Sequence, residues 1–198
     1  MGKYQIITKK GYDGTEVISA LQKSIRRGKE SEALFWAVEL YDSNYGEWCF
    51  KRLRIMSSED IGLAEPSISS EIWALYEMYR EQAKKKEDKN EPQRLFLTHA
   101  VIKLCRAKKS RLIDWALIWA WLRHPFSKFD IPDVALDKHT ARGRQMNRGF
   151  GHFFEEGTIL IPHVKQPWED DYRDLAKSGI ENRSQGKGLF DVDEDVLS

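Results

Sequence analysis

Apolar residues recur at helical spacing along most of the first 122 residues. After Asp13, the residues Val17, Leu21 and Ile25 return every four positions until Gly28. This spacing predicts an amphipathic helix that Asp13 caps and the glycine ends. The same periodicity predicts further helices over residues 31–41, 47–56, 67–84, 93–107, 112–122 and 169–176.

Two of the predicted helices are apolar on every side. They cover residues 31–41 and 112–122, and the second includes Trp115, Trp119 and Trp121. A helix that is apolar all round belongs in a core. We therefore expect both helices to be buried, and the three tryptophans to be core residues rather than a platform on which bases stack.

The alternation typical of strands is weak, although residues 4–8 and 158–162 could form short extended pieces. The predicted fold class is all-α, a helical bundle or array of about six to eight helices with a small irregular C-terminal appendage. A chain of 198 residues with 41% hydrophobic residues can bury one main core. The predicted parts are an N-terminal arm over residues 1–12, a helical domain over 13–163, a C-terminal helix or appendage over 164–180 and a disordered acidic tail over 181–198.

No segment predicts export or membrane insertion. The N-terminal apolar run is too short for a signal peptide, and no apolar run reaches membrane-spanning length. Cys49 and Cys105 lie far apart, without the spacing of a disulfide framework. We expect a cytoplasmic protein that has no membrane partner.

Overall charge does not indicate a nucleic-acid binder, because 32 Lys and Arg residues nearly balance 31 Asp and Glu residues. One basic cluster gathers around the end of a predicted helix. Its members are the nucleic-acid candidates Lys103, Arg106, Lys108, Lys109 and Arg111. They could bind phosphates in a salt-dependent way, with Arg142, Arg144 and Arg148 as a second cationic group. They could equally complement the dipole at a helix end.

Polar side chains are densest between residues 136 and 160. If this segment is read as a helix from Pro132 onward, its apolar stripe stops after Leu136, and Gly143 interrupts the polar row that follows. Such breaks favour either a functional site or a structural ion-pair network. The polar constellation consists of Asp137, His139, Thr140, Arg142, Arg144, Arg148, His152, Glu155 and Glu156.

Two kinds of chemistry are open to this constellation. His152 and Glu155, with His139 or Asp137, could hold a metal ion, and either histidine near Glu156 could act in acid–base catalysis. We favour a structural network, assign no metal, cofactor or catalytic residue, and expect His139, Arg148, His152 and Glu155 to converge.

Three stretches resemble a known family. They are SALQKSIRRGKESEALFW at residues 19–36, RLRIMSSEDIGLAEP at residues 52–66 and LTHAVIKLCRAKKS at residues 97–110. Together they resemble the region that follows the ATPase module in Rar/Mgs-type replication-associated AAA+ proteins. The resemblance covers roughly residues 15–122, whereas the segment beyond Pro125 differs from the family's usual ending.

The resemblance implies a helical collar related to clamp-loader oligomerisation domains. It therefore implies a homo-oligomer, with a replication ATPase, a sliding clamp or DNA as further partners. The chain has no G-x-x-x-x-G-K-[ST] phosphate loop, so we expect no ATP hydrolysis by it alone. Our leading hypothesis is a non-catalytic accessory or oligomerisation module of DNA replication or recombination-repair. The competing hypothesis is a small metal- or acid–base-dependent enzyme built on residues 137–156.

The C-terminal tail offers a weaker motif. Gln185, Leu189 and Phe190 have a spacing loosely similar to that of bacterial sliding-clamp-binding peptides. The alternative is a tail that only solubilises the protein.

Overall fold

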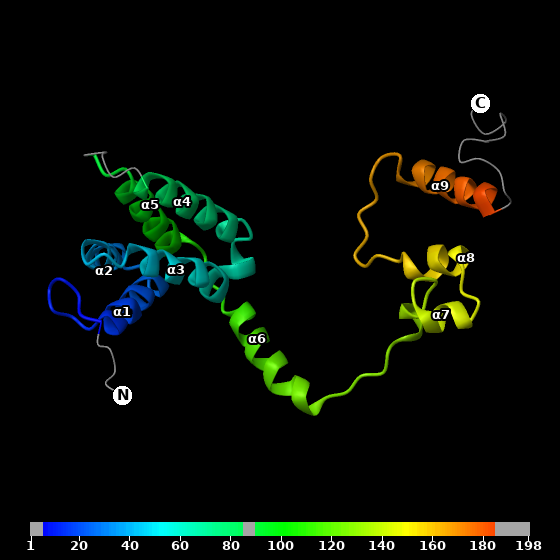
Figure 1. Ribbon diagram of the computed structural model, residues 1–198, viewed down its shortest axis with the longest axis horizontal. Helices are drawn as coiled ribbons and strands as arrows, with labels where there is room; N and C mark the ends of the chain where they lie inside the picture. The colour runs from blue at the N-terminus through cyan, green and yellow to red at the C-terminus, as the bar shows by residue number, and fades with distance from the viewer. Residues whose placement is uncertain (1–5, 85–89, 185–198) are drawn as a thin grey trace. The chain divides into compact units, whose positions relative to one another are not determined.

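The computed structural model describes residues 6–84 and 90–184. The chain forms two compact units, Met1–Lys128 and Phe129–Ser198. Within the described residues all regular elements are helical, apart from an isolated bridge between Ile7 and Asp13 (Figure 1). The predicted all-α fold is confirmed.

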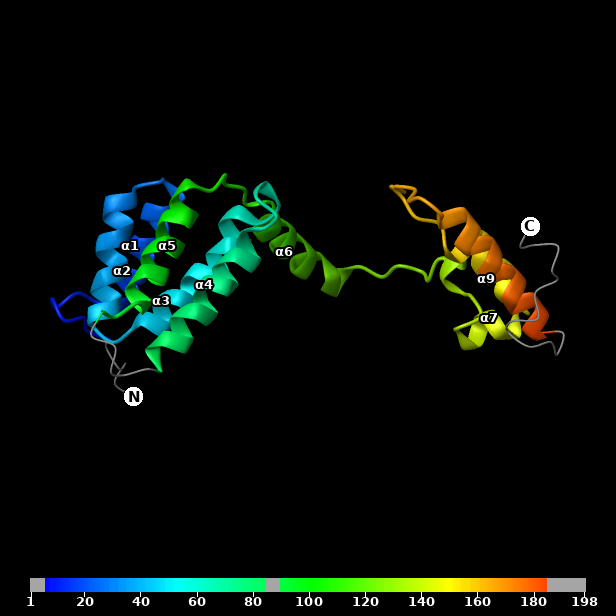
Figure 2. The same cartoon turned by 90° about the horizontal axis from the view of Figure 1, so that it is seen from above.

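The first unit begins with two helices that lie side by side, α1 (Gly14–Arg26) and α2 (Glu30–Asp42) (Figure 2). Asp13 caps α1, because its carboxylate accepts hydrogen bonds from the backbone N–H groups of Thr15 and Glu16. Gly28 takes the positive φ of 66° that reverses the chain between the two helices. Both ends of the predicted first helix are therefore confirmed.

Three more helices complete the core of this unit: α3 (Gly46–Met56), α4 (Ile68–Ala83) and α5 (Gln93–Arg106). Gly46 allows α3 and α4 to approach closely, since a Cβ there would lie 2.2 Å from the hydroxyl of Tyr79. The largest fully buried side chains are Phe50, Leu21, Ile25, Leu40, Leu53, Met56, Ile61, Ile68, Ile72, Leu104, Val17 and Val101. All of them lie between residues 17 and 104, so α1–α5 and the turn after α3 enclose the core.

The S-S-E-D-I-G-L motif forms this turn between α3 and α4. Ser57–Ile61 is a π-helical turn (η1), and Gly62–Ala64 is a 3-10 turn (η2). Gly62 has a positive φ of 49°, while Asp60 and Ile61 are buried. The glycine thus ends the π-helical turn that follows α3, and the two residues before it enter the core.

The next helix, α6 (Leu112–Arg123), is followed by the 3-10 turn His124–Phe126 (η3). The predicted burial of α6 is wrong, because none of its residues is buried. It lies mainly against η1 and η2, which cover too little of it to enclose an apolar helix. The predicted all-round burial of α2 is also wrong, since Phe35 and Val38 are exposed while Ala37 and Leu40 are buried.

The second unit contains a 3-10 turn (η4, Asp133–Ala135), two short helices, α7 (Ala141–Gln145) and α8 (Phe150–His152), a π-helical turn (η5, Phe153–Gly157) and the longer helix α9 (Glu169–Ser184). Pro132 precedes only a single turn, so no long helix runs from it. Residues 158–162 form no strand. Leu136 is the only buried hydrophobic side chain among the described residues of this unit.

Gly143 is tightly packed, and helix α9 extends into the predicted tail. A Cβ on Gly143 would lie 1.9 Å from the carbonyl oxygen of Asp137, so this buried glycine meets the backbone of another segment. Helix α9 continues to Ser184, past the predicted start of the tail at residue 181. Residues 185–198, with Gln185, Leu189 and Phe190, and residues 1–5 of the predicted arm lie outside the described residues.

Candidate functional site

Helix α6 presents an apolar surface on the first unit. Trp115, Trp119, Trp121 and Leu122 are 61%, 62%, 73% and 68% exposed. Its charged side chains lie close to the two ends, with Asp114 in the first turn and Arg123 in the last. Single exposed apolar residues are ordinary on a protein surface, but a contiguous apolar helix is typical of an interaction site.

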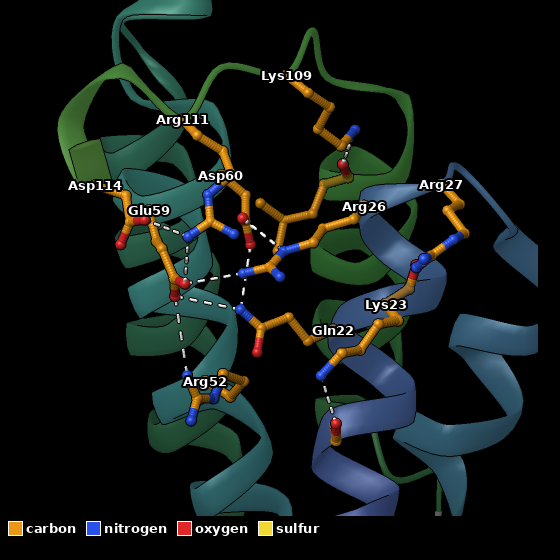
Figure 3. A network of polar contacts seen from close by, with 12 residues as sticks. Gln22, Lys23, Arg26, Arg27, Arg52, Glu59, Asp60, Lys109, Arg111 and Asp114 are labelled. Atoms are coloured by element: carbon orange, nitrogen blue, oxygen red, sulfur yellow. Dashed lines mark hydrogen bonds and ion pairs between the residues drawn. The ribbon is translucent and has the colours of Figure 1, made fainter.

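The start of α6 is attached to the S-S-E-D-I-G-L turn. The backbone N–H of Ser110 donates to the carbonyl oxygen of Asp60 at 2.9 Å. The guanidinium of Arg111 lies 3.5 Å from the carboxylate of Glu59 and also pairs with Asp114, which raises the pKa of Arg111. Polar contacts therefore hold the first turn of this helix (Figure 3).

Glu59 and Asp60 are the centre of a larger polar network (Figure 3). Asp60 is 2% exposed and accepts hydrogen bonds from Arg26 at 2.7 Å and from Gln22 at 3.3 Å. Glu59 accepts hydrogen bonds from Arg26 at 2.8 Å and from Gln22 at 3.2 Å, and lies 3.9 Å from Arg52. Buried carboxylates are stable only with such partners. The network joins α1, α3 and the entrance of α6.

The predicted basic cluster is largely occupied by contacts within the chain. Lys103 pairs with Glu65 at 2.7 Å and with Glu71 at 2.9 Å, and these bonds raise the pKa of Lys103. Arg106 pairs with Glu30 at 2.7 Å. These cations are therefore less available to phosphates than their spacing in the sequence suggests.

Lys109 and Lys108 differ in whether their side chains have partners within the chain. The Lys109 amine donates to the carbonyl oxygens of Leu104, Cys105 and Ala107 at 2.8, 2.9 and 2.6 Å, so it caps the C-terminal end of α5. Burial lowers the pKa of this amine. The exposed Lys108 side chain makes no hydrogen bond or ion pair with any described residue.

Local contacts order the first half of the polar constellation in the second unit. The carboxylate of Asp137 lies 2.9 Å from Nδ1 of His139 and accepts from its backbone N–H, which lowers the pKa of Asp137. Thr140 caps α7 by accepting from the N–H of Gly143. Arg144 donates to the carbonyl oxygens of residues 138 and 139. This half is a connected turn rather than an open site.

Arg148 is held by Asp133 and Leu136, which lie outside the predicted polar constellation. Its guanidinium donates to both carboxylate oxygens of Asp133, at 2.7 and 2.6 Å, and to the carbonyl oxygens of Asp133 and Leu136. The side chain is 16% exposed. Arg148 therefore closes the η4 turn onto the segment after α7.

The remaining members of the constellation do not join this network. The Arg142, Glu155 and Glu156 side chains are exposed and make no hydrogen bond or ion pair with the described residues. Nδ1 of His152 is buried without a hydrogen-bond partner there. The contacts found join His139 to Asp137 and Arg148 to Asp133, and they do not join the four residues that we expected to converge.

No group of three or more His, Cys, Asp or Glu side chains in the described ranges could hold a metal ion. Gln22, Arg26, Arg52, Glu59, Asp60 and Gly62 were not among the candidate site residues predicted from the sequence. The available signal was the S-S-E-D-I-G-L motif within residues 52–66, which supported the family resemblance but was not recognised as part of a site.

The helical fold and this motif define the class of the protein as the helical region that accompanies an AAA+ ATPase. The family model described as "MgsA AAA+ ATPase C terminal" matches residues 29–158, and the chain belongs to this family. Replication-associated recombination protein A of Bacillus subtilis (strain 168) is 28% identical over 158 residues, covering 77% of this chain and 36% of the relative. The chain thus spans about a third of the length of that curated relative.

The family match changes one interpretation of the sequence. Because it reaches residue 158, the segment beyond Pro125 lies within the family region, and the predicted departure from the family's ending is wrong.

Among the described residues, no helix has the length and apolar character needed to cross a membrane.

Proposed function

We propose that this chain is a helical module of DNA replication or recombination-repair that assembles with further copies of itself through α6. The observation that carries the proposal is that no residue of this almost wholly apolar helix is buried. Burying such a surface against a partner removes apolar area from water, which favours association. The name of the Bacillus subtilis relative supports a role in replication-associated recombination.

A second copy of α6 is a suitable partner because the helix is nearly self-complementary. Its 12 residues span about 18 Å. An antiparallel pair centred between Ile118 and Trp119 would place Asp114 of one copy near Arg123 of the other, with the tryptophans between them. The proposed product is a dimer, or a tetramer if a second surface contributes.

The proposed oligomer of this chain would act as part of a larger complex. Contact with a replication ATPase, a sliding clamp or DNA is proposed as the use of such an oligomer, in line with the family resemblance. Direct DNA contact through residues 103–111 would rest mainly on Lys108, because the other four cations already have partners.

Light scattering over a range of protein concentrations tests the proposal. The wild-type chain should form a dimer or tetramer at tens of micromolar, and Trp119→Glu should be monomeric there, because a carboxylate would be buried in the interface. Trp168→Glu is the matched control, since Trp168 is 71% exposed but lies in the second unit. A wild-type chain that stays monomeric at 100 micromolar would refute the proposal.

The enzyme hypothesis has one observation in its favour, the Asp137–His139 pair, whose histidine is exposed. This pair resembles the orienting half of an acid–base site. A metal assay of the purified protein, and loss of any hydrolytic activity in His139→Ala, would test the hypothesis.

A further inference from the structure

The S-S-E-D-I-G-L turn has a role that self-association through α6 leaves unexplained. We propose that residues 57–62 are a socket that fixes the direction of α6, and thereby decide which assembly its apolar surface forms. The socket is defined by Ser57–Gly62, and this inference rests on the proposed function.

Burial of side chains cannot set the direction of α6. A helix of the core is oriented by the apolar face that it buries, but α6 buries no residue. Within the first unit α6 lies mainly against η1 and η2. Its direction must therefore depend on the contacts that its first turn makes with these two turns.

Asp60 connects the entrance of α6 to the core. Its carboxylate is held by Arg26 and Gln22 of α1, and its carbonyl oxygen accepts the N–H of Ser110. At 2% exposure it has no room to shift without losing these bonds. The chain therefore reaches α6 from a fixed point.

One carboxylate oxygen of Glu59 is shared between two helices. Oε1 of Glu59 lies 2.8 Å from Arg26 of α1 and 3.5 Å from Arg111 at the start of α6. Arg111 also pairs with Asp114, one turn into α6. These pairs link the first turn of α6 to α1 through a single carboxylate (Figure 3).

Gly62 and Ile113 approach each other closely. A Cβ on this residue would lie 2.8 Å from Cγ1 of Ile113, and its φ of 49° favours glycine. Ile113 can therefore settle over the turn only because position 62 has no side chain. Polar bonds and one steric fit together fix α6, while its tryptophans remain more than half exposed.

Spin-label distances test whether the socket fixes α6. Thr98→Cys on α5 and Ala116→Cys on α6 place two labels at exposed positions. Burial raises the pKa of the native Cys49 thiol to about 12 and that of Cys105 to about 11, so both should resist labelling. The labelled chain also carries Trp119→Glu, so that only distances within one molecule are measured.

We expect one narrow distance distribution in this background and a clearly broader one after Glu59→Gln or Arg111→Gln. The double variant should be no broader than either single variant, because the two residues act through each other. Glu71→Gln is the matched control, since Glu71 pairs with Lys103 and lies outside the socket. Distributions that stay narrow in Glu59→Gln would overturn the inference.

Sedimentation equilibrium then tests the consequence for assembly with unlabelled chains. Glu59→Gln should weaken association by about tenfold or more, or change the number of subunits, while Glu71→Gln should do neither. Association that is unchanged in Glu59→Gln would overturn the link between socket and assembly. A monomeric wild-type chain would instead refute the proposed function, and the label distances would still report on the socket.

Discussion

Residues 14–107 and residues 108–184 of this chain use apolar side chains in opposite ways. In the first region α1 has a single apolar stripe, and Val17, Leu21 and Ile25 on it are buried. In the second region α6 is far richer in apolar residues and none of them is buried. Apolar content therefore does not decide burial.

The difference lies in what faces each helix. A stripe can be covered by one neighbouring layer, as α2 and α5 cover α1. A helix that is apolar all round needs partners on several sides, whereas α6 lies mainly against the short turns η1, η2 and η3. The second region is instead ordered by local polar contacts, such as those of Asp137 and Arg148.

The largest difference in the free energy of unfolding should appear when one leucine in each region is truncated to alanine. Leu53→Ala should lower the free energy of unfolding by about 3 to 4 kcal/mol, because Leu53 is fully buried and the change leaves a cavity. Leu122→Ala should change it by about 0.5 kcal/mol or less, because Leu122 is 68% exposed. Urea unfolding at concentrations where the chain is monomeric measures both, and equal losses would break the comparison.

The next largest effect on stability should come from Asp60, which links the core helices to the start of α6. Asp60→Asn keeps the size of the side chain but leaves Arg26 with less compensation, and should cost about 2 to 3 kcal/mol. The measurement is again urea unfolding, with Glu71→Gln as a more exposed carboxylate that should cost about 0.5 kcal/mol or less. A loss as small as that of the control would show that the network contributes little to the fold.

In the second unit, Arg148→Ala should destabilise more than Glu155→Ala. Arg148 is mostly buried and holds the Asp133 and Leu136 carbonyl oxygens, so its loss should cost about 1 to 2 kcal/mol. Glu155 is exposed, and its removal should leave the melting temperature nearly unchanged. Thermal melts compare the two, and the reverse order would mean that the expected convergence on Glu155 occurs after all.

The smallest effect is the titration of Asp137. The His139 side chain holds the pKa of this carboxyl below its usual value, so His139→Ala should raise that pKa. Because the folded pKa is lowered, the pair contributes stability above the ordinary aspartate pKa of about 4, and this contribution is lost as the pH falls through the folded pKa. Carboxyl titration by NMR measures the shift, and an unchanged pKa would show that the two side chains do not pair in solution.

The ends of the helices could be predicted from local chemistry. Asp13 caps α1 and Gly28 reverses the chain after it, and both effects depend only on residues within one turn of each other. The family could be recognised from the sequence for a similar reason, since the S-S-E-D-I-G-L motif is contiguous. Hydrogen bonds inside a turn are a property of the local sequence.

The candidate site could be predicted only in part. Thr140 and Asp137 make the local contacts that polar turn residues favour, whereas Arg148 reaches Asp133, 15 residues away. The basic residues 103–111 were visible as a cluster, but their acidic partners Glu30, Glu65 and Glu71 come from other helices. Sequence spacing reveals charges, and it does not reveal which charges the fold pairs.

The sequence by itself determined the helices, their caps and the family, because these depend on short-range periodicity and on contiguous motifs. Only the tertiary structure decided that α6 is exposed and that Glu59 and Asp60 meet Arg26, more than thirty residues earlier in the chain. Periodicity shows which faces of a helix are apolar, but burial depends on which other segments pack against those faces. The packing of the whole unit decides this, because five helices enclose a core and the sixth lies outside it.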